Sequence, residues 1–414
     1  MPPCEQGVWN TGLASGQPDE NMLRVVTVHN YYQQPGGENV SFEAEAALLE
    51  DRGHRVARFC MHNDRITASN EILAAAAAVW NHSAYRGVRR LVQETGAAVC
   101  HFHNTFPLLS PAAYYGAKAS NAAIVQKVSN FRLLCPGANL LRNGSPCEDC
   151  VGRIAPWPGV RHRCYRGSVL ASASVATMLT VHRILRTWSQ CVDAYIALTE
   201  FGKQKLIEGG LPASRIHVKP NFLYRDPGQG TSRGNYALYV GRLSPEKGIE
   251  TLLAAWRSAR PGLTLRIVGD SRDSTYVRVI RRDEDGVEWL GWLSRERTME
   301  QMKCAEFLVV PSVCYETFGL VVIEAYATGA PVIASRLGAL QSIVDDKRTG
   351  LLFEAGNAQD LASKIDWLLT HPAPVAEMRL EARREYEEKY TADVNYRRLI
   401  EIYDAAVRHA RTRN

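Results

Sequence analysis

The chain has 414 residues, 46% of them hydrophobic and 22% charged, with a net charge of +6. This length allows two domains, and the composition is that of a globular protein. No stretch reaches the ~18–20 apolar residues of a transmembrane helix. Residues 1–21 are polar and lack the basic start and apolar core of a secretory signal. We therefore expect a disordered segment over residues 1–21 and a cytoplasmic protein.

The first half of the chain alternates apolar strands with helical stretches. A helix is expected at residues 41–51, and strands are expected within residues 23–29, 52–59, 99–103, 123–128, 193–198 and 216–219. Such alternation is typical of a parallel sheet with helices on its faces. The pattern predicts a first Rossmann-like domain over residues 22–222.

A polar, glycine-rich stretch separates this half from a second one. Its composition over residues 223–235 is typical of a linker and predicts a hinge. Alternation then resumes, with strands expected at residues 237–240, 264–268, 287–290, 307–310 and 331–334. We expect a second Rossmann-like domain over residues 236–390 and a C-terminal helix over residues 391–414.

Two glutamates stand eight positions apart in the run 311–324. Glu324 interrupts an apolar stretch, and an unpaired buried carboxylate is costly, so polar groups should meet it. A helix that begins at Phe318 offers free backbone N–H groups to an anion, and Gly319 lets a ligand approach closely. The pattern predicts an anion site with Glu316 at its mouth and Glu324 bound to a pair of hydroxyls.

The run 236–248 is predicted to form a strand, a tight turn and a helix start. Arg242 and Lys247 lie on that turn. A guanidinium fork and an ammonium point charge are natural partners of a diphosphate. Together with the carboxylates and the helix start, they predict a site for a sugar nucleotide.

These two runs resemble the Glu-x7-Glu and Gly-Arg-Leu-x-x-Glu-Lys-Gly motifs of the retaining glycosyltransferases of family 4. The motifs lie about 70 residues apart, and the resemblance extends from about Leu23 to the C-terminus. It implies an α/β fold called GT-B, in which two Rossmann-like parallel-sheet domains face each other across a cleft. It also implies that the C-terminal helix packs back on the N-terminal, acceptor-side domain.

The resemblance assigns roles to the residues of both motifs. Arg242, Lys247 and the amides of Phe318, Gly319 and Leu320 would stabilise the departing diphosphate. Glu316 would hold the donor sugar and Glu324 the ribose. Glu316, Arg242 and Lys247 are thus the expected catalytic residues. No catalytic metal is expected, since the Asp-x-Asp at 283–285 has the composition of a solvated turn.

Two further places complete the expected donor site. Gly36 and Gly37 follow the first strand, where similar enzymes bring backbone N–H groups to the donor phosphate; a plain tight turn is the alternative. Leu290 and Trp292 follow a strand of the second half. The resemblance places the nucleobase there, with Trp292 able to stack on it.

The acceptor side is expected at two strand ends of the first half. His101 and His103 alternate, so both point to one face of their strand. A metal pair is disfavoured because no third ligand lies nearby in sequence. His103 and Asn104 are predicted to contact the acceptor, and a buried structural histidine is the alternative.

Ser129 and Asn130 follow the next expected strand of the acceptor side. Similar enzymes usually have histidine where Ser129 stands, near the reacting sugar carbon. Serine lacks the charge and reach of imidazole, so this departure puts the usual role of the position in doubt, and transfer activity with it.

Cys135, Cys147, Cys150 and Cys164 fall within an expected insertion over residues 132–166. One Cys-x2-Cys pair with two outlying thiols resembles a zinc knuckle, and zinc would hold an insertion too small for a core. His162 is a substitute ligand. Unbound thiols are the main alternative, because a disulfide is disfavoured in a chain without a secretory signal.

Residues 151–192 contain six arginines and no Asp or Glu. This asymmetry favours an anionic partner, either a phosphorylated acceptor or the inner face of a membrane, with a solvated basic face as the alternative. Nucleic acid is disfavoured because no recognition motif accompanies the charge.

The sequence thus predicts a retaining hexosyltransferase of cell-envelope or exopolysaccharide assembly, with a sugar-nucleotide donor and a glycan or lipid-linked acceptor. One alternative is a sugar-nucleotide hydrolase or epimerase of the same architecture. The other is a sugar-nucleotide-binding scaffold with weak or no catalysis, motivated by Ser129 and the cysteine-rich insertion.

Overall fold

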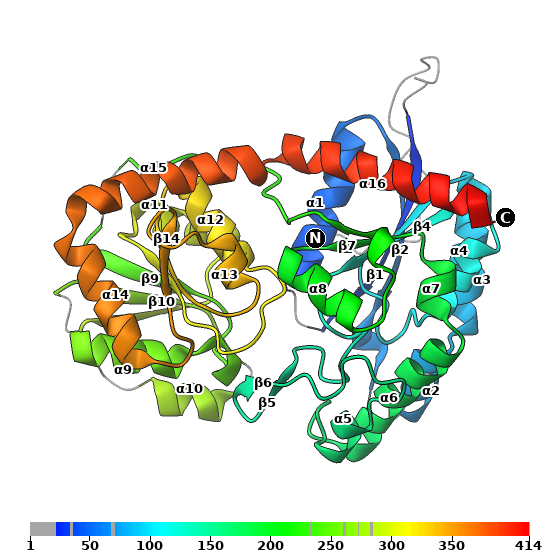
Figure 1. Ribbon diagram of the computed structural model, residues 1–414, viewed down its shortest axis with the longest axis horizontal. Helices are drawn as coiled ribbons and strands as arrows, with labels where there is room; N and C mark the ends of the chain where they lie inside the picture. Colours follow the sequence, from blue (N-terminus) through cyan, green and yellow to red (C-terminus); the bar gives the residue numbers. More distant parts are fainter. Residues whose placement is uncertain are drawn as a thin grey trace. The chain divides into compact units, whose positions relative to one another are not determined.

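The computed structural model of the chain describes residues 22–33, 36–67, 71–231, 234–259, 262–271, 273–281 and 285–413. Contacts divide it into two units (Figure 1). The first unit comprises the described part of Met1–Ala138, Glu148–Lys219 and Asn395–Asn414; the second comprises Asn139–Cys147 and Pro220–Val394.

The first unit is built on a six-stranded parallel sheet of order β2-β1-β3-β4-β7-β8. The strands are β1 (Arg24–Tyr31), β2 (Arg55–His62), β3 (Val99–Phe102), β4 (Ala123–Val128), β7 (Ala194–Ala197) and β8 (Ile216–Val218). The helices are α1 (Gly37–Asp51), α2 (Glu71–Val79), α3 (His82–Thr95), α4 (Ala112–Lys118), α5 (Trp157–Arg161), α6 (Val169–Ile184), α7 (Thr187–Cys191), α8 (Glu200–Glu208) and α16 (Ala392–Arg413). Short 3₁₀ turns occupy Asn63–Arg65 and Ala213–Arg215.

Helices α1 and α16 cover one face of this sheet. Leu399, Tyr403 and Ala406 of α16 pack in one core cluster with β-strand residues such as Val25 and Val125. Apolar strands buried on both faces are typical of parallel sheets, because helices cover each side. The C-terminal helix therefore belongs to the core of the first unit, although a whole unit separates it in sequence.

The second unit repeats the plan with a six-stranded parallel sheet of order β11-β10-β9-β12-β13-β14. Its strands are β9 (Tyr236–Val240), β10 (Thr264–Val268), β11 (Val287–Gly291), β12 (Leu308–Val310), β13 (Val332–Ser335) and β14 (Gly350–Phe353). Its helices are α9 (Ile249–Ala259), α10 (Ser274–Ile280), α11 (Arg295–Cys304), α12 (Leu320–Thr328), α13 (Leu340–Ile343), α14 (Ala358–Thr370) and α15 (Pro372–Lys389), with a 3₁₀ turn at Pro245–Lys247. A hairpin of β5 (Leu141–Arg142) and β6 (Ser145–Pro146) groups with this unit.

The predicted fold class, two α/β units with parallel sheets, is confirmed. Strand β14 escaped prediction, because Leu351, Leu352 and Phe353 form too short an apolar run. No helix among the described residues has the length and apolar character needed to cross a bilayer.

The glycine-rich segment 223–235 is not the linker that its composition predicts. Where the structure describes it, the segment packs on the second unit. The crossings that flank the main part of this unit lie at Lys219–Pro220 and Val394–Asn395, outside the predicted linker. Gly230 donates its N–H to the Thr328 carbonyl at 3.1 Å. A Cβ on Gly230 would lie 1.9 Å from the carbonyl oxygen of Lys303. Glycine here permits close packing, which composition cannot distinguish from flexibility.

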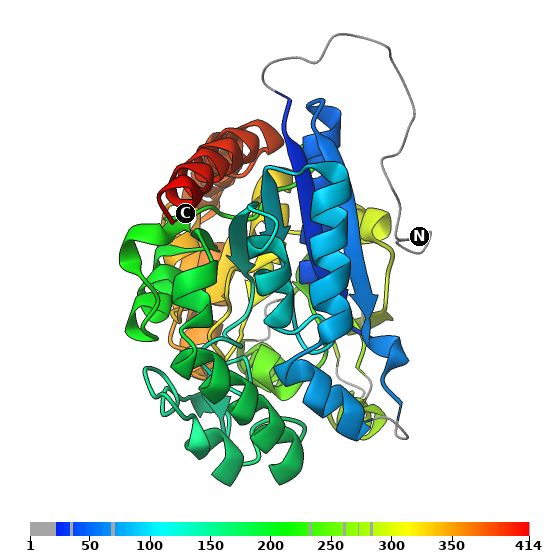
Figure 2. The ribbon, with the colours of Figure 1, turned by 90° about the vertical axis from the view of Figure 1, so that its right-hand side faces the viewer.

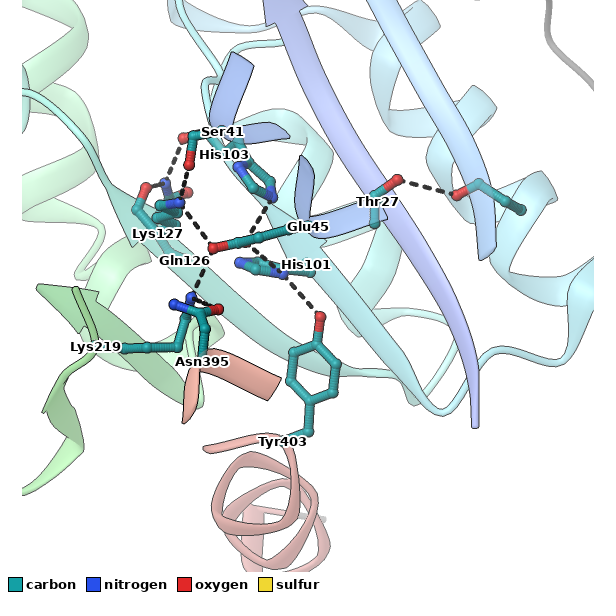
Figure 3. Close-up of polar contacts among 11 residues, drawn as sticks. Thr27, Ser41, Glu45, His101, His103, Gln126, Lys127, Lys219, Asn395 and Tyr403 are labelled. Carbon is teal, nitrogen blue, oxygen red and sulfur yellow. Dashed lines mark hydrogen bonds and ion pairs between the residues drawn. The ribbon is translucent and has the colours of Figure 1, made fainter. Parts of the chain in front are cut away.

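A buried ion-pair network joins the elements of the first unit (Figure 3). Glu45 of α1 is 1% exposed, and its Oε1 accepts hydrogen bonds from Lys127 Nζ of β4 at 2.8 Å and from Lys219 Nζ at 2.6 Å. Lys219 Nζ also donates to Asn395 Oδ1 at 2.9 Å. Lys219 and Asn395, which flank the main segment of the second unit in sequence, are thus bonded to each other within the first unit.

Two histidines lie on the other side of the same carboxylate. His103 Nε2 is 3.4 Å from Glu45 Oε2, and His101 Nδ1 is 2.8 Å from the hydroxyl of Tyr403 in α16. Burial lowers the pKa of His101 to about 3 and also lowers that of His103. Burial alone would raise the pKa of Glu45, but Lys127 and Lys219 hold it well below its ordinary value. The network is therefore one carboxylate shared by two ammonium groups beside neutral imidazoles.

Removing the charge of Glu45 should destabilise the protein strongly. Glu45→Gln keeps the side-chain shape but leaves two buried ammonium groups without a counter-charge, which costs about 3–5 kcal/mol. The matched control is Glu50→Gln on the same helix, whose partner Arg58 lies at the surface and whose loss costs below about 1 kcal/mol. Urea-induced unfolding measures both variants. Equal losses would contradict the role of the network.

Acidification should also destabilise the native state. Burial lowers the pKa of His29 to about 4 and that of His101 to about 3, from an ordinary value of 6.5. Below about pH 6.5 the unfolded chain therefore binds more protons than the folded one, so the free energy of unfolding falls as the pH drops toward 4. Urea titrations across this range measure the slope, and His29→Gln should make it shallower. A slope that this variant leaves unchanged would contradict the assignment.

Candidate functional site

The two sequence motifs of the second unit interlock at one edge of its sheet. Gly248, after the β9 turn, has a positive φ of 69°, and a Cβ there would lie 1.9 Å from the Pro311 carbonyl oxygen. Val313 donates its N–H to the Glu246 carbonyl at 3.0 Å. Glycine is required at this contact because any side chain would separate the two loops. The fold thus joins turns that are about 70 residues apart in sequence.

Lys247 and Glu316 form an ion pair across this contact. Lys247 Nζ is 2.6 Å from Glu316 Oε1, which also accepts from Ser312 Oγ at 2.7 Å. Burial works against both charges, yet their mutual attraction raises the pKa of Lys247 and lowers that of Glu316. The two predicted catalytic residues therefore meet, both in their charged forms at neutral pH.

Arg242 and Glu324 each have a partner that the sequence did not indicate. Arg242 pairs with Glu246 at 2.7 Å while its side chain remains 55% exposed. Glu324 Oε1 is 3.0 Å from Arg295 of α11. Burial outweighs the attraction of Arg295 and raises the pKa of Glu324. Glu246 lies inside the predicted motif and could have been found there, whereas no local pattern marks Arg295.

Helix α12 begins beside the ion pair. Gly319 is its N-cap residue with a φ of 103°, so the helix starts at Leu320, two residues after the predicted start at Phe318. The Phe318 side chain is buried and packs against Tyr390, with ring centroids 6.0 Å apart. Phe318 therefore anchors the loop, and the helix terminus beside it offers backbone N–H groups to an anion.

The ends of β9, β10 and β11 lie at this same edge. Gly241 donates its N–H to the Val268 carbonyl at 3.0 Å, and Gly269 donates to the Gly291 carbonyl at 2.9 Å. Leu290 lies in β11, and Trp292, just beyond it, is 74% exposed. The predicted nucleobase residues therefore share an edge with Arg242, at the carboxyl ends of parallel strands where ligands of such sheets bind.

In the first unit, a polar cluster surrounds Asn130. Its Nδ2 donates to Glu38 Oε1 at 2.7 Å and to the Tyr32 hydroxyl at 3.2 Å. Glu38 belongs to the first turn of α1, which starts at Gly37 with Gly36 as its N-cap residue. Burial raises the pKa of Glu38. Glu38 and Tyr32 join the candidate residues that sequence reasoning missed, since neither lies in a motif.

His103 and Asn104 are buried, which favours the structural alternative for both. Asn104 Nδ2 donates to the Asn30 carbonyl at 2.7 Å, and its Oδ1 accepts from the Phe106 N–H at 3.1 Å. His103 belongs to the Glu45 network. The His103 backbone N–H donates to the Val28 carbonyl at 2.9 Å, and its Nε2 lies 3.4 Å from Glu45 Oε2, so His103 and Asn104 shape the strand end.

The Glu45 network contains the side chains that often bind a metal ion, but two lysines beside them make the site positively charged. One ligand atom each of Glu45, His101 and His103 lie within 4.8 Å of one another. Lys127 and Lys219 already hold Glu45 Oε1 with two positive charges. A divalent cation here would be repelled by both ammonium groups, so the cluster suits an ion pair better than a metal.

The structure does not support the predicted zinc knuckle. Cys135, Cys150 and Cys164 belong to the first unit, and their sulfurs do not converge as a group among the described residues. Cys147 groups with the second unit. Cys150 Sγ donates to the Pro156 carbonyl at 3.8 Å. Spacing alone cannot position four thiols, because each also depends on the turn that carries it.

Arg183 of α6 holds the insertion instead. Its guanidinium donates to the backbone carbonyls of Leu133 at 2.8 Å, Leu134 at 3.3 Å and Ile154 at 3.5 Å, and to that of Arg153.

The acidic loop predicted at 283–285 lies outside the described residues except for Asp285.

Alanine at position 248 should disrupt the site. Gly248→Ala places a Cβ against the Pro311 carbonyl and imposes a strained positive φ, so the two loops must separate and donor binding should be lost. Gly356→Ala is the matched control, because Gly356 has a φ of 81° in the same unit but no atom within 4 Å of its Cβ position. Calorimetric titration with sugar nucleotides measures both. Equal affinity in the two variants would refute the importance of the contact.

Comparisons with known proteins find similarity to glycosyltransferases. Residues 234–371 match the family described as glycosyl transferases group 1. The uncharacterized glycosyltransferase MJ1178 of Methanocaldococcus jannaschii is 36% identical over 133 residues, which are 32% of this chain and 37% of that protein. Glycogen synthase of Mycobacterium tuberculosis is 31% identical over 220 residues, 50% of this chain and 49% of that enzyme. The chain thus spans about half or less of the length of these curated relatives.

A solved structure resembles the fold over nearly the whole chain. The complex of Anabaena Alr3699/HepE with UDP and glucose has a TM-score of 0.65 at 18% identity, and the match covers 92% of this chain and 99% of that chain. Residues 234–371 are therefore similar to the group 1 glycosyl transferases, and the chain has the two-sheet α/β fold, called GT-B, that the solved structure shows.

Proposed function

We propose that the protein is a retaining glycosyltransferase of family 4 that moves a sugar from a nucleotide diphosphate to an acceptor hydroxyl. The observation that carries this proposal is the Lys247–Glu316 pair, which joins the two motif turns beside the start of α12. The group 1 match over residues 234–371 supports a transferase reaction. The UDP and glucose of the Anabaena complex support a nucleotide-sugar donor.

The donor diphosphate would bind between the two motif turns. Departure of the nucleotide builds negative charge on its phosphate oxygens. Lys247, the exposed fork of Arg242 and the N–H groups at the start of α12 are positive groups held in place before the reaction, and such preorganised groups stabilise a leaving anion. No step requires a metal ion to neutralise that charge.

The two carboxylates would hold the hydroxyls of the donor. Glu316, already ionised beside Lys247, accepts hydrogen bonds from the sugar and stabilises the positive charge that develops on its ring. Glu324 is largely buried beside Arg295, and hydroxyls of the ribose would supply further hydrogen bonds to its carboxylate. The nucleobase would lie against Leu290 and Trp292 at the end of β11. The departing phosphate receives the acceptor proton on the same face, which retains configuration.

The roles of Gly36, Gly37, Ser129 and Asn130 rest on the family resemblance. Gly36 and Gly37 stay predicted contacts of the donor phosphate, and Ser129 and Asn130 stay predicted contacts of the acceptor. A glycan or lipid-linked acceptor of cell-envelope or exopolysaccharide assembly is part of the same proposal. A contact with an anionic membrane surface is supported by the arginines of residues 151–192.

A second candidate function is a sugar-nucleotide-binding scaffold. Ser129 favours it, because a hydroxyl replaces the imidazole that similar enzymes have near the reacting carbon. A hydrolase or epimerase of sugar nucleotides is the third. The reaction products separate these candidates, since only a transferase requires an acceptor.

Donor binding and turnover should both depend on the ion pair. We expect one of a panel of uridine, guanosine and adenosine diphosphate sugars to raise the melting temperature. Lys247→Met and Glu316→Gln should each lower the rate of diphosphate release by about 10²–10³-fold. Lys364→Met and Glu377→Gln, in helices away from the motif turns, are the matched controls and should retain the rate.

Each other outcome identifies a different function. Stabilisation without turnover indicates the scaffold, and release of free sugar without an acceptor indicates the hydrolase. If no donor stabilises the protein, or the two site variants behave like the two controls, the proposed site is wrong.

A further inference from the structure

The insertion of the first unit presents an exposed apolar face. Helices α2, α5 and α6 lie together in both views (Figures 1 and 2), and α6 packs against the other two. Leu170 is 82% exposed and Ile184 is 66% exposed. The exposed large apolar side chains of this region, here called the insertion face, are Leu73, Trp80, Ile154, Trp157, Val169, Leu170, Ile184 and Leu185.

The outward stripe of α6 carries no charge. The stripe consists of the partly or fully exposed positions Leu170, Ala173, Ser174, Thr177, Val181 and Ile184, which follow a helical spacing. The other partly or fully exposed positions of α6 are Val169, Ala171, Thr180 and Arg183. This stripe is roughly 21 Å long at 1.5 Å per residue. A surface helix normally turns charged residues outward. Here the two titratable residues of the helix are bonded within the protein: His182 to Thr187 and the Val79 carbonyl, and Arg183 to carbonyls of the insertion.

Exposed cations surround this uncharged stripe. The exposed arginines of the insertion and its flanks are Arg153, Arg161, Arg163, Arg166 and Arg186. Glu71 of α2 pairs with Arg166 at 3.7 Å, and the insertion also holds Glu148, which pairs with Lys205, and the exposed Asp149 beside Arg153. The sequence has no Asp or Glu between Val151 and Val192. Apolar side chains and cations are therefore exposed on neighbouring helices and loops of one region, in which carboxylates are few.

We propose that the insertion face docks on an anionic lipid bilayer. Its apolar side chains enter the boundary between headgroups and acyl chains, the two tryptophans lie at headgroup depth, and the arginines pair with lipid phosphates. A bilayer fits better than a protein partner because the apolar side chains project from separate helices, and a fluid surface needs no matching shape. The positive charge of the exposed arginines complements the layer of negatively charged phosphates at the bilayer surface.

This docking does not depend on donor chemistry. Its use, to hold the enzyme where a lipid-linked acceptor lies, rests on the proposed function. The insertion would then serve as the element that binds the membrane, and Arg183, which ties its loops to α6, would keep the face in shape.

The test is sedimentation of the full-length protein with vesicles. We expect binding to vesicles that contain phosphatidylglycerol, weak binding to vesicles of phosphatidylcholine alone, and release by high salt. The double variants Leu170→Ser/Ile184→Ser and Arg161→Gln/Arg163→Gln should each lower the vesicle affinity at least tenfold. The controls Leu380→Ser and Arg384→Gln, at exposed positions of α15, should leave it unchanged.

Three results would overturn the inference. They are no binding to anionic vesicles, unchanged binding of both double variants, or self-association of the native protein that the apolar double variant abolishes. The melting temperature confirms that the variants fold. The donor sugar should raise the melting temperature of the variants as much as that of the native protein. Such a result shows that loss of lipid binding is separate from loss of the donor site.

Discussion

A single buried carboxylate, shared by two lysines, is the interaction on which the first unit depends. Glu45 lies on α1, Lys127 on β4 and Lys219 at the point where the chain leaves the unit, while Asn395 bonds Lys219 at the point of return. Any one of these groups without its partners would be a charge or polar atom buried alone, which is costly. The network therefore forms only when helix, strand and both chain crossings are in place together (Figure 3).

The second unit achieves a similar coupling with backbone atoms. Gly248 brings the turn after β9 against the loop after β12, and that contact places Lys247 within ion-pair distance of Glu316. Both side chains are largely withdrawn from water, so their attraction is stronger than at a surface. The site is thus charged and ordered before a donor arrives, which is the condition for electrostatic stabilisation of a leaving group. Arg242, paired only at the surface with Glu246, has room to turn toward a phosphate.

Sequence reasoning succeeded where one local rule governs a segment. Alternation of strands and helices predicted both parallel sheets, and the run that holds Glu316 and Glu324 predicted a helix start at Phe318, two residues before the helix begins at Leu320. Sequence reasoning failed where the same residue composition is compatible with two different structures. Gly230 permits close packing where a flexible linker was expected, and Asn104 uses its amide inside the strand end. Arg295 and Glu38 were missed because their partners, Glu324 and Asn130, are distant in sequence.

The sequence by itself determined the fold class and marked the charged residues of the predicted donor site, because strand periodicity and the two motifs are local patterns. Only the tertiary structure decided which charges meet. It joined Lys247 to Glu316, separated the cysteines, enclosed His103 in the Glu45 network and turned Arg183 inward while Leu170 and Ile184 remain exposed. The physical reason is that pairing and burial depend on distances between segments remote in sequence. Those distances follow from the packing of helices on sheets rather than from any local run of residues.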